Sequence, residues 1–368
     1  MEEDKQIRKI RMILPRLKII PRRNLGIDIG TSSIRLVELS RWRGREKLEN
    51  YGEIKAKTLF KKPFRTFEKS TLSVSGGDVS RAIQAIIQEA GIKTKTAIFS
   101  IPDFSSFFTS FDLPPMTEEE LPQAVRYEAR RHIPLPPSEV TLDWQIIEGR
   151  LSSREKSPLK ILLVAVPNEV INQYREIASM AQLELQALEA EVFGLTRSLV
   201  KESGEIVCLV DIGAQTTTVS VIDKKILKLS HSFDVSGNEL TSIVSKSLGI
   251  SYEEAEDLKG KIGLKKNDQK IREILLPLLD LITVEIDKIS RVFYQTEGKK
   301  IQKVILAGSS ALLLGLVDYF SENLKLEKGV EIANPFSGIF YPPILENTLK
   351  EMGPGYAIAV GMSLRGLE

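Results

Sequence analysis

Two segments of the chain combine a carboxylate, a glycine turn and several hydroxyls in a way that suits phosphate binding. They read GIDIGTSS from residue 26 and LVDIGAQT from residue 209. In each, an apolar strand delivers one aspartate, Asp28 or Asp211, to a turn where glycine lets the backbone approach an anion closely. Successive backbone N–H groups at such a turn form a concave anion site, to which hydroxyls add donors. The turn residues predicted to bind phosphate are Gly30, Thr31, Ser32, Gly213 and Thr216.

The two aspartates are predicted to hold Mg²⁺ rather than phosphate. Carboxylates and phosphates repel each other, whereas Mg²⁺ accepts one or two carboxylates while it keeps several waters. A single Asp-Ile-Gly turn is weak evidence for a nucleotide site, because ordinary hairpins also contain this sequence. Two copies in matching strand–turn–strand settings favour a nucleotide site. Neither copy is a P-loop or a dinucleotide fingerprint, since neither turn leads directly into a helix.

The elements that must position these turns form two halves of an α/β protein. The first half is predicted to contain strands over 25–75, a helix over 78–90, a strand from 94, a strand over 160–166 and helices near 168–180 and 190–200. The second half is predicted to contain three strands over 205–235, a long helix over 270–297, a strand over 303–308 and an apolar helix over 356–366. Ser251 and Glu254 form a capping-box signature for a short helix that Gly260 is expected to close.

The composition excludes several classes of protein. The 368 residues include 51 Lys and Arg against 49 Asp and Glu, and this net charge of +2 gives no case for nucleic-acid binding. The single cysteine, Cys208, rules out an intramolecular disulfide and a cysteine-based zinc site. The apolar runs are too short to span a bilayer, and the N-terminus lacks the features of a secretory signal. We therefore expect a cytoplasmic protein.

Residues 1–24 differ from the rest of the chain. They mix basic residues with large apolar ones in the run KQIRKIRMILPRLKIIPRR. A basic amphipathic segment can lie on an anionic membrane surface. A flexible tail is the other interpretation of the same composition.

Two β-hairpins that face each other across a cleft are typical of the actin-like ATPase superfamily. Further motifs in the sequence resemble one branch of that superfamily. LGIDIGTSSIRLVEL, LEAEVFGLTRSL and KVILAGSSALLLGLVDYF resemble segments of the type IV pilus assembly protein PilM family, which is related to the division protein FtsA. The resemblance covers about residues 25–366. It implies an actin-like ATPase fold in which two lobes of duplicated mixed β-sheet surround a nucleotide cleft. The implied subdomains are 1A (25–93 and 160–203), an inserted small α+β subdomain (94–159), 2A (204–235 and 300–368) and 2B (236–299).

The resemblance also implies ATP as the cofactor, bound together with Mg²⁺. Glu256 and Lys259 match a pair that contacts ribose and adenine, and their spacing puts them on one helix face. A solvated salt pair is the alternative interpretation. The adenosine loop reads AGSS, where relatives usually carry two or three consecutive glycines. The other residues that match the nucleotide-binding positions are Gly237, Asn238, Gly308 and Ser309.

Hydrolysis needs a group that orients or deprotonates the attacking water. Glu189 and Glu191, at the start of the helix near 190–200, are the candidates for this catalytic role. The alternative is that both carboxylates stabilise the N-terminus of that helix. The phosphate turns contain no Lys or His, so we expect ATP to act mainly as an assembly ligand that closes the cleft, with slow hydrolysis at most.

The resemblance implies a protein partner at the inserted subdomain. In PilM-like proteins this region receives the cytoplasmic N-terminal peptide of PilN, a bitopic inner-membrane protein. The candidate features are the run FSSFFTSF over 104–111 and the helix that carries Val125, Tyr127 and Arg130. Such a protein would lie on the inner face of the inner membrane, held there by its partner and, in one interpretation, by residues 1–24. Pilus motor ATPases and further copies of the chain are additional candidate partners.

Three other functions remain open at this point. The first is an FtsA-like filament-forming protein, although such chains usually continue into a linker and an amphipathic helix, and this one ends at Glu368 after its last predicted helix. The second is a cytoplasmic component of a type II secretion platform. The third is a sugar or acetate kinase of the same superfamily, for which we find no convincing substrate carboxylate.

Overall fold

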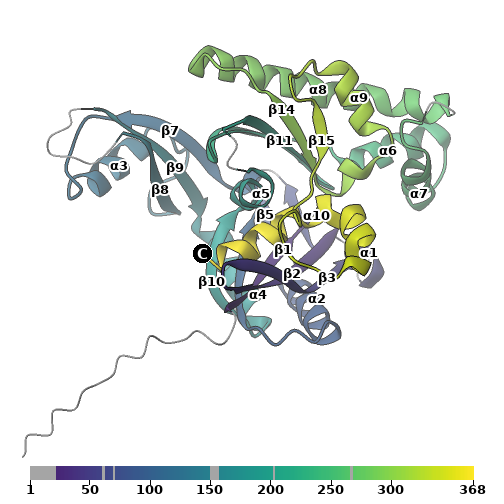
Figure 1. Cartoon of the computed structure of the whole chain (residues 1–368), viewed down its shortest axis with the longest axis horizontal. Coiled ribbons are helices and arrows are strands. Elements are labelled where there is room, and N and C mark those ends of the chain that lie inside the picture. The colour runs from purple at the N-terminus through teal and green to yellow at the C-terminus, as the bar shows by residue number, and fades with distance from the viewer. Residues whose placement is uncertain (1–21, 60–62, 69–70, 150–156, 202–203, 266–267) are drawn as a thin grey trace, which may run out of the picture.

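The computed structural model describes residues 22–368, except for 60–62, 69–70, 150–156, 202–203 and 266–267. The described chain has two lobes, each built on a five-stranded sheet, and a small third sheet that projects from the first lobe (Figure 1). Helices α5 (Glu191–Leu199) and α10 (Glu346–Arg365) lie between the lobes. Of the predicted basic extension over residues 1–24, residues 1–21 lie outside the described part, and residues 22–24 belong to the first strand.

The sheet of the first lobe has the strand order β10-β6-β1-β2-β3. Strand β1 runs antiparallel to β2 and parallel to β6. Apolar residues at alternate positions of β1, including Ile27 and Ile29, pack against helices α2 (Gly76–Glu89) and α4 (Asn168–Met180). The strands are β1 (Arg22–Ile29), β2 (Ser33–Trp42), β3 (Arg45–Lys55), β6 (Thr96–Ile101) and β10 (Glu184–Ala190).

The second lobe repeats this topology. Its strand order is β13-β12-β11-β14-β15, and β11 runs antiparallel to β12 and parallel to β14. Each strand of the second sheet therefore has a counterpart in the first, which confirms the duplicated mixed sheet that the resemblance implies. The strands are β11 (Ile206–Ile212), β12 (Thr217–Asp223), β13 (Ile226–Phe233), β14 (Lys303–Ala307) and β15 (Val330–Ile332).

The chain between β6 and α4 forms a small α+β module at the side of the first lobe (Figure 1). Its sheet has the order β7-β9-β8, so β7 is an edge strand. Thr117 and Glu120 make the reciprocal bonds of a capping box before α3. Helix α3 then packs on the sheet through Leu121, Val125 and Ala129. The elements are β7 (Phe107–Leu113), α3 (Leu121–Ala129), β8 (Val140–Glu148) and β9 (Leu159–Pro167).

Helices cover the outer side of the second lobe. The longest, α8 (Gln269–Glu297), buries Leu275, Leu279 and Ile282 at helical spacing against the sheet. Ser251 and Glu254 form the predicted capping box of α7 (Tyr252–Ile262). The predicted end of that helix at Gly260 is wrong. The remaining helices of this lobe are α6 (Gly237–Leu248), η2 (Ser309–Leu312) and α9 (Leu316–Asn323).

Helix α10 contacts both lobes and packs unusually close to its neighbours. A Cβ on Gly361 would collide with the carbonyl of Gly194 in α5, and a Cβ on Gly26 would collide with the carbonyl of Ala359. The helix begins ten residues before the predicted start at 356, and Pro354 lies inside it. The other elements are α1 (Ala56–Leu59), β4 (Arg65–Glu68), β5 (Thr71–Val74), η1 (Asp103–Ser105) and η3 (Pro343–Leu345). Across the described ranges, every helix is too short or too polar to cross a bilayer.

Candidate functional site

The two predicted phosphate turns have the same geometry. The N–H of Gly30 donates to the carbonyl of Ser33 at 2.9 Å, and the N–H of Gly213 donates to the carbonyl of Thr216 at 3.0 Å. A Cβ on either glycine would lie 2.9 Å from that same carbonyl oxygen. Only glycine therefore fits these turns without displacing the backbone that follows.

The turns come from different lobes and meet at their tips. The hydroxyl of Thr31 in the first turn donates to the side-chain carbonyl of Gln215 in the second at 3.4 Å. Beside them, Arg35 of β2 donates to the hydroxyl of Ser309 at 2.6 Å, which also joins the two lobes. The two turns thus border one shared site, as required if both are to hold one triphosphate.

A cluster of carboxylates, buried except for the partly exposed Asp211, lies behind the two tips. Asp28 accepts a hydrogen bond from the Ser100 hydroxyl at 2.8 Å. Burial, reinforced by the charges of Glu191 and Asp28, raises the pKa of Asp211 to about 7. Burial and the charge of Glu191 also raise the pKa of Asp103 well above its usual range. Like charges placed this close together are unfavourable unless a cation joins them.

The donor set suits a cation held through water better than one held directly. Among the described residues, no group of three or more His, Cys, Asp and Glu side chains lies close enough to ligate a metal ion. Mg²⁺ keeps several waters and is usually bound by one or two carboxylates plus phosphate oxygens. Asp28 and Asp211, one from each lobe, fit that requirement.

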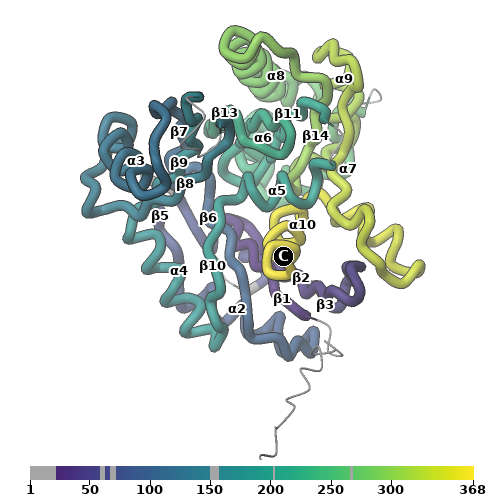
Figure 2. The backbone as a smooth tube through the Cα atoms, turned by 60° about the vertical axis from the view of Figure 1, so that its left-hand side comes forward, coloured from purple at the N-terminus to yellow at the C-terminus, as the bar shows by residue number. Residues whose placement is uncertain are grey.

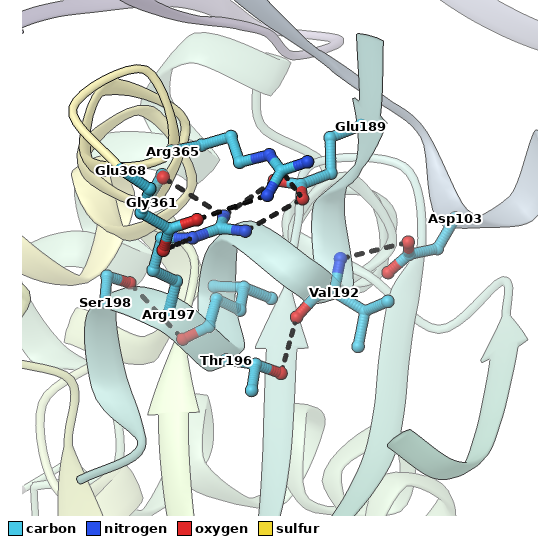
Figure 3. A network of polar contacts seen from close by, with 10 residues as sticks. Asp103, Glu189, Val192, Thr196, Arg197, Ser198, Gly361, Arg365 and Glu368 are labelled. Carbon is cyan, nitrogen blue, oxygen red and sulfur yellow. Dashed lines mark hydrogen bonds and ion pairs between the residues drawn. The ribbon is translucent and has the colours of Figure 1, made fainter. Parts of the chain in front are cut away.

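Glu191 lies in the cluster and is tightly held. Its carboxylate accepts from Nη2 of Arg65 at 2.8 Å and from the N–H of Asp103 at 3.3 Å. In return, Asp103 accepts from the N–H of Val192 at 3.1 Å and so caps the start of α5 (Figure 3). Burial raises the pKa of Glu191, and the Arg65 charge opposes that rise.

Glu189, the second catalytic candidate, lies outside this cluster. Its carboxylate binds the Arg197 guanidinium with two hydrogen bonds of 2.7 and 2.9 Å. Arg197 also donates to Glu368 at 2.9 Å and to the carbonyl of Gly361 at 3.3 Å (Figure 3). Glu189 therefore takes part in a network that attaches α5 to the C-terminal helix.

The predicted nucleoside-side residues gather around the second turn. The N–H groups of Gly237 and Asn238, at the start of α6, donate to the carbonyls of Gly213 and Ala214, each at 2.9 Å. Helix α6 is therefore attached directly to the second phosphate turn.

Lys259 ties α7 to this same region. Its amine donates to the carbonyl of Gly237 at 3.0 Å, to the hydroxyl of Thr241 at 2.7 Å and to the carboxylate of Glu256 at 2.8 Å. The side chain of Lys259 is buried, while that of Glu256 is 42% exposed. This geometry differs from a solvated salt pair. The buried Lys259 amine uses all three of its hydrogen-bond donors, and only the Glu256 side chain is exposed to solvent.

The AGSS segment closes the other side of the site. Gly308 has φ +82°, and a Cβ there would lie 2.6 Å from the carboxylate of Asp211. The hydroxyl of Ser310 lies where a Cβ on Gly237 would collide with it. Ser310 therefore fills space that depends on Gly237, a glycine of another element.

Three residues of the site escaped sequence reasoning. Arg35 pairs in register with Asp28 across β1 and β2, so alternation along a strand could have indicated that both face the cleft. Asp103 and Arg65 carry no comparable signal, because they reach the cluster from a 3₁₀ turn and a short hairpin.

A groove of about 480 Å³ lies between the small module and the second lobe. One wall comes from β7 and the turn before it, and the other from β13, which is the edge strand of its sheet. Figure 2 shows β13 beside the module. Both histidines lie here, with His132 stacked on Phe111 at 5.2 Å and His231 stacked on Phe233 at 6.0 Å. The predicted run over 104–111 contributes lining residues, whereas α3 contributes none of them.

Comparison with known proteins gives one family and several relatives. A family model described as type IV pilus assembly protein PilM matches residues 26–367. The cell division protein FtsA of Enterococcus faecalis is 23% identical over 351 residues, which cover 82% of this chain and 78% of FtsA.

Solved structures show the same fold. A PilM chain in a PilM–PilN type IV pilus biogenesis complex has a TM-score of 0.80 and 23% identity, covering 94% of this chain and 98% of that one. The ethanolamine utilization protein EutJ of Carboxydothermus hydrogenoformans has a TM-score of 0.55 and 18% identity, covering 94% and 90%. These similarities confirm the actin-like ATPase fold.

Proposed function

Because the chain belongs to the type IV pilus assembly protein PilM family, we propose that it is an ATP-binding adaptor of a pilus assembly platform. The observation that carries this proposal is the meeting of two glycine turns of the same geometry, one from each lobe, in front of a cluster of carboxylates. In this proposal the protein works on the inner face of the inner membrane, where a membrane partner recruits it.

The residues for ATP and Mg²⁺ follow from the contacts around the turns. The N–H groups and hydroxyls over 31–32 and 214–216 would donate to the phosphates, since the N–H groups of Gly30 and Gly213 are bonded within their own turns. Mg²⁺, when bound, neutralises charge that develops on the phosphates. Asp28 and Asp211 would hold its waters, and their unfavourable mutual charge is the reason that the site favours a cation. Glu256 would reach the sugar of the nucleotide, because Lys259 fixes the helix from which it projects.

Glu191 is the residue that we assign to the attacking water. Its raised pKa suits a general base, but its pair with Arg65 and its bond to the Asp103 N–H restrict it. A base that is already paired works poorly, so hydrolysis would be slow and ATP would serve mainly to hold the lobes together. Glu189 is the weaker candidate for this role, because both oxygens of its carboxylate are bonded to Arg197.

We test the nucleotide site by calorimetry with Mg²⁺ and ATP. Asp28→Ala and Asp211→Ala are expected to weaken binding at least about tenfold, since each removes a charged partner of the bound cation. Asp223→Ala is the matched control, because Asp223 is a buried aspartate at the far end of β12, where it binds Lys299 at 2.7 Å. Wild-type affinity in both cleft variants would refute the site.

The groove between β7 and β13 is our candidate for the partner peptide. The PilM relative of known structure was solved in a complex with PilN, and we propose that this chain binds the N-terminal cytoplasmic peptide of a PilN-like protein. Two edge strands face the groove, and an extended peptide commonly adds a strand to such an edge. Phe104, Phe107 and Phe108 would supply apolar contacts.

A pair of adjacent substitutions tests this proposal. Thr109 lines the groove, while Ser110, the next residue of β7, is exposed and lies outside the lining. Successive side chains of a strand point to opposite faces. Thr109→Arg should weaken binding of a synthetic PilN-like peptide at least about tenfold by filling the groove, and Ser110→Arg should leave it unchanged. Equal effects of the two variants would refute the groove as the binding site.

A filament-forming role like that of FtsA is the second candidate function. The similarity to FtsA over 82% of the chain favours it. Electron microscopy of the protein with Mg²⁺ and ATP distinguishes the two roles, because long ATP-dependent filaments are expected only for the second.

A further inference from the structure

An arginine-rich edge lies at one end of the sheet of the first lobe. Strand β1 begins there at Arg22, directly opposite Arg41 of β2. Strands β2 and β3 meet one residue further on, where Trp42 pairs with Arg45 across a two-residue turn. The first phosphate turn follows the other end of β1, so this edge and the nucleotide site lie at opposite ends of the same strands.

The turn between β2 and β3 holds an arginine in a conformation that favours other residues. Arg43 has φ +51° and Gly44 has φ +79°. Two-residue hairpin turns with positive φ at both positions strongly prefer Asn-Gly, Asp-Gly or Gly-Gly, because longer side chains are strained there. The guanidinium of Arg43 lies 5.6 Å from the centre of the Trp42 ring, and Trp42 is 39% exposed. The turn therefore presents a cation and an aromatic ring together at its tip.

Most of the positive charge at this edge is not compensated. Arg41 is paired with Glu46 at 2.7 Å. By contrast, the three exposed residues Arg22, Arg43 and Arg45 form no ion pair with any described part of the chain. The sequence that precedes Arg22 adds six Lys and Arg against three Asp and Glu over residues 1–21, mixed with large apolar residues. Positive charge gathered in one place attracts negatively charged partners.

We propose that this edge binds directly to a membrane surface of anionic lipid, with Trp42, Arg43 and Arg45 as the contacting residues. Tryptophan is enriched at the membrane–water interface, and each arginine near an anionic surface strengthens the attraction. Basic residues mixed with large apolar ones, as over 1–21, are typical of segments bound at that interface. These apolar residues favour lipid over duplex nucleic acid, whose phosphates need the charges alone. The inference goes beyond the proposed function and depends on neither ATP nor a partner peptide.

Vesicle sedimentation of the full chain, without nucleotide or partner peptide, tests the inference. The protein should sediment with vesicles of phosphatidylglycerol and phosphatidylcholine and stay in solution with phosphatidylcholine alone. Arg43→Glu and Arg45→Glu should each weaken binding at least about fivefold, the contribution expected of one arginine near an anionic surface. Lys224→Glu is the matched control, because exposed Lys224, with φ +53°, is the first residue of the equivalent turn between β12 and β13. It makes the same change in charge on the other lobe and should leave binding unaltered.

Tryptophan fluorescence provides a second measurement. The chain has two tryptophans, Trp42 and Trp144, so Trp144→Phe leaves Trp42 as the only one. Its emission should shift to shorter wavelength when anionic vesicles are added, as the ring enters the interface. Wild-type binding in both hairpin variants, equal losses in Arg43→Glu and Lys224→Glu, or an unshifted Trp42 emission would overturn the inference. Tighter binding to duplex DNA than to anionic vesicles would also overturn it. None of these results affects the nucleotide site or the groove, which have their own binding tests.

Discussion

Replacing Asp211 by asparagine should stabilise the nucleotide-free protein while it weakens nucleotide binding. Asp211 has a pKa of about 7 in the folded chain against 3.8 in the unfolded chain. The folded state therefore keeps its proton between those two values, where the unfolded state has lost it. Folding stability falls as the pH rises through that window and stays constant above it. Asparagine carries no charge, so the variant should keep its folding stability as the pH rises through this window.

The shift in the pKa of Asp211 determines how much folding stability the asparagine variant gains. Three pKa units correspond to about 4 kcal/mol in the free energy of unfolding above pH 7. Asp211 keeps part of its surface exposed, and solvent there screens the charge, so we expect about half of that value. The gain of Asp211→Asn should therefore reach about 2 kcal/mol at pH 8 and shrink as the pH approaches 4.

Urea denaturation of the nucleotide-free protein at pH 8 and pH 5 measures both quantities. Asp223→Asn is the control of opposite sign, because that buried aspartate is paired with Lys299 at 2.7 Å and its loss should destabilise the protein. If Asp211→Asn lowered the stability as much as Asp223→Asn does, the cleft would not be a site of unfavourable charge. The reasoning behind the Mg²⁺ site would then fail.

Three further substitutions, with Gly298→Ala as a control for the first, test Gly308, the network around Glu189 and the contacts of Lys259. Gly308→Ala should cost about 2–3 kcal/mol in urea denaturation, since it combines a positive φ with a collision against Asp211. Gly298→Ala, also at positive φ but with open space around it, should cost only about 1 kcal/mol. Glu189→Gln should lower the free energy of unfolding by about 1–3 kcal/mol through its bonds to Arg197, while nucleotide affinity measured by calorimetry stays unchanged. Lys259→Met should lower nucleotide affinity about tenfold, and an unaltered affinity would remove the α6–α7 corner from the site.

The duplicated fold was predictable because its signal is local. Each half opens with a strand, a glycine turn and a second strand, and these need no distant contact to be visible in the sequence. The order of the remaining strands depends on pairing between distant segments, such as β11 with β14. That information came from the family resemblance and not from the residues themselves.

Helix ends show how local signals can mislead. The capping box of Ser251 and Glu254 is a pattern of contacts within four residues, and it was correctly predicted. Gly260 was wrongly predicted as the end of α7. Glycine inside a helix is unfavourable but tolerated, so its presence alone does not end one. A Cβ at Gly260 would meet no neighbour, so no tertiary contact requires glycine at this position. The helix ends instead at Gly263, which has φ +56° and packs against Leu314 of a distant segment.

The two candidate catalytic carboxylates could not be distinguished from the sequence alone. Glu189 and Glu191 are two residues apart, but β10 ends and α5 begins between them. The change from strand to helix turns one side chain toward Arg197 and the other toward Arg65. Arg65 itself lies in a short hairpin without a motif, so only the folded chain reveals that it pairs with Glu191.

Residues outside the AGSS segment explain how its two serines are accommodated. Ser310 fits because Gly237, at the start of α6, leaves room for its hydroxyl. Ser309 accepts from Arg35, which also binds Glu53 at 2.7 Å and lies over the ring of Tyr356 at 5.7 Å. Where relatives usually carry further glycines, this chain has two serines, one of which makes a contact between the lobes. If the proposed site binds a nucleotide, the ligand would compete with, or rearrange, the bond between Arg35 and Ser309, and closure of the cleft would then depend on the ligand.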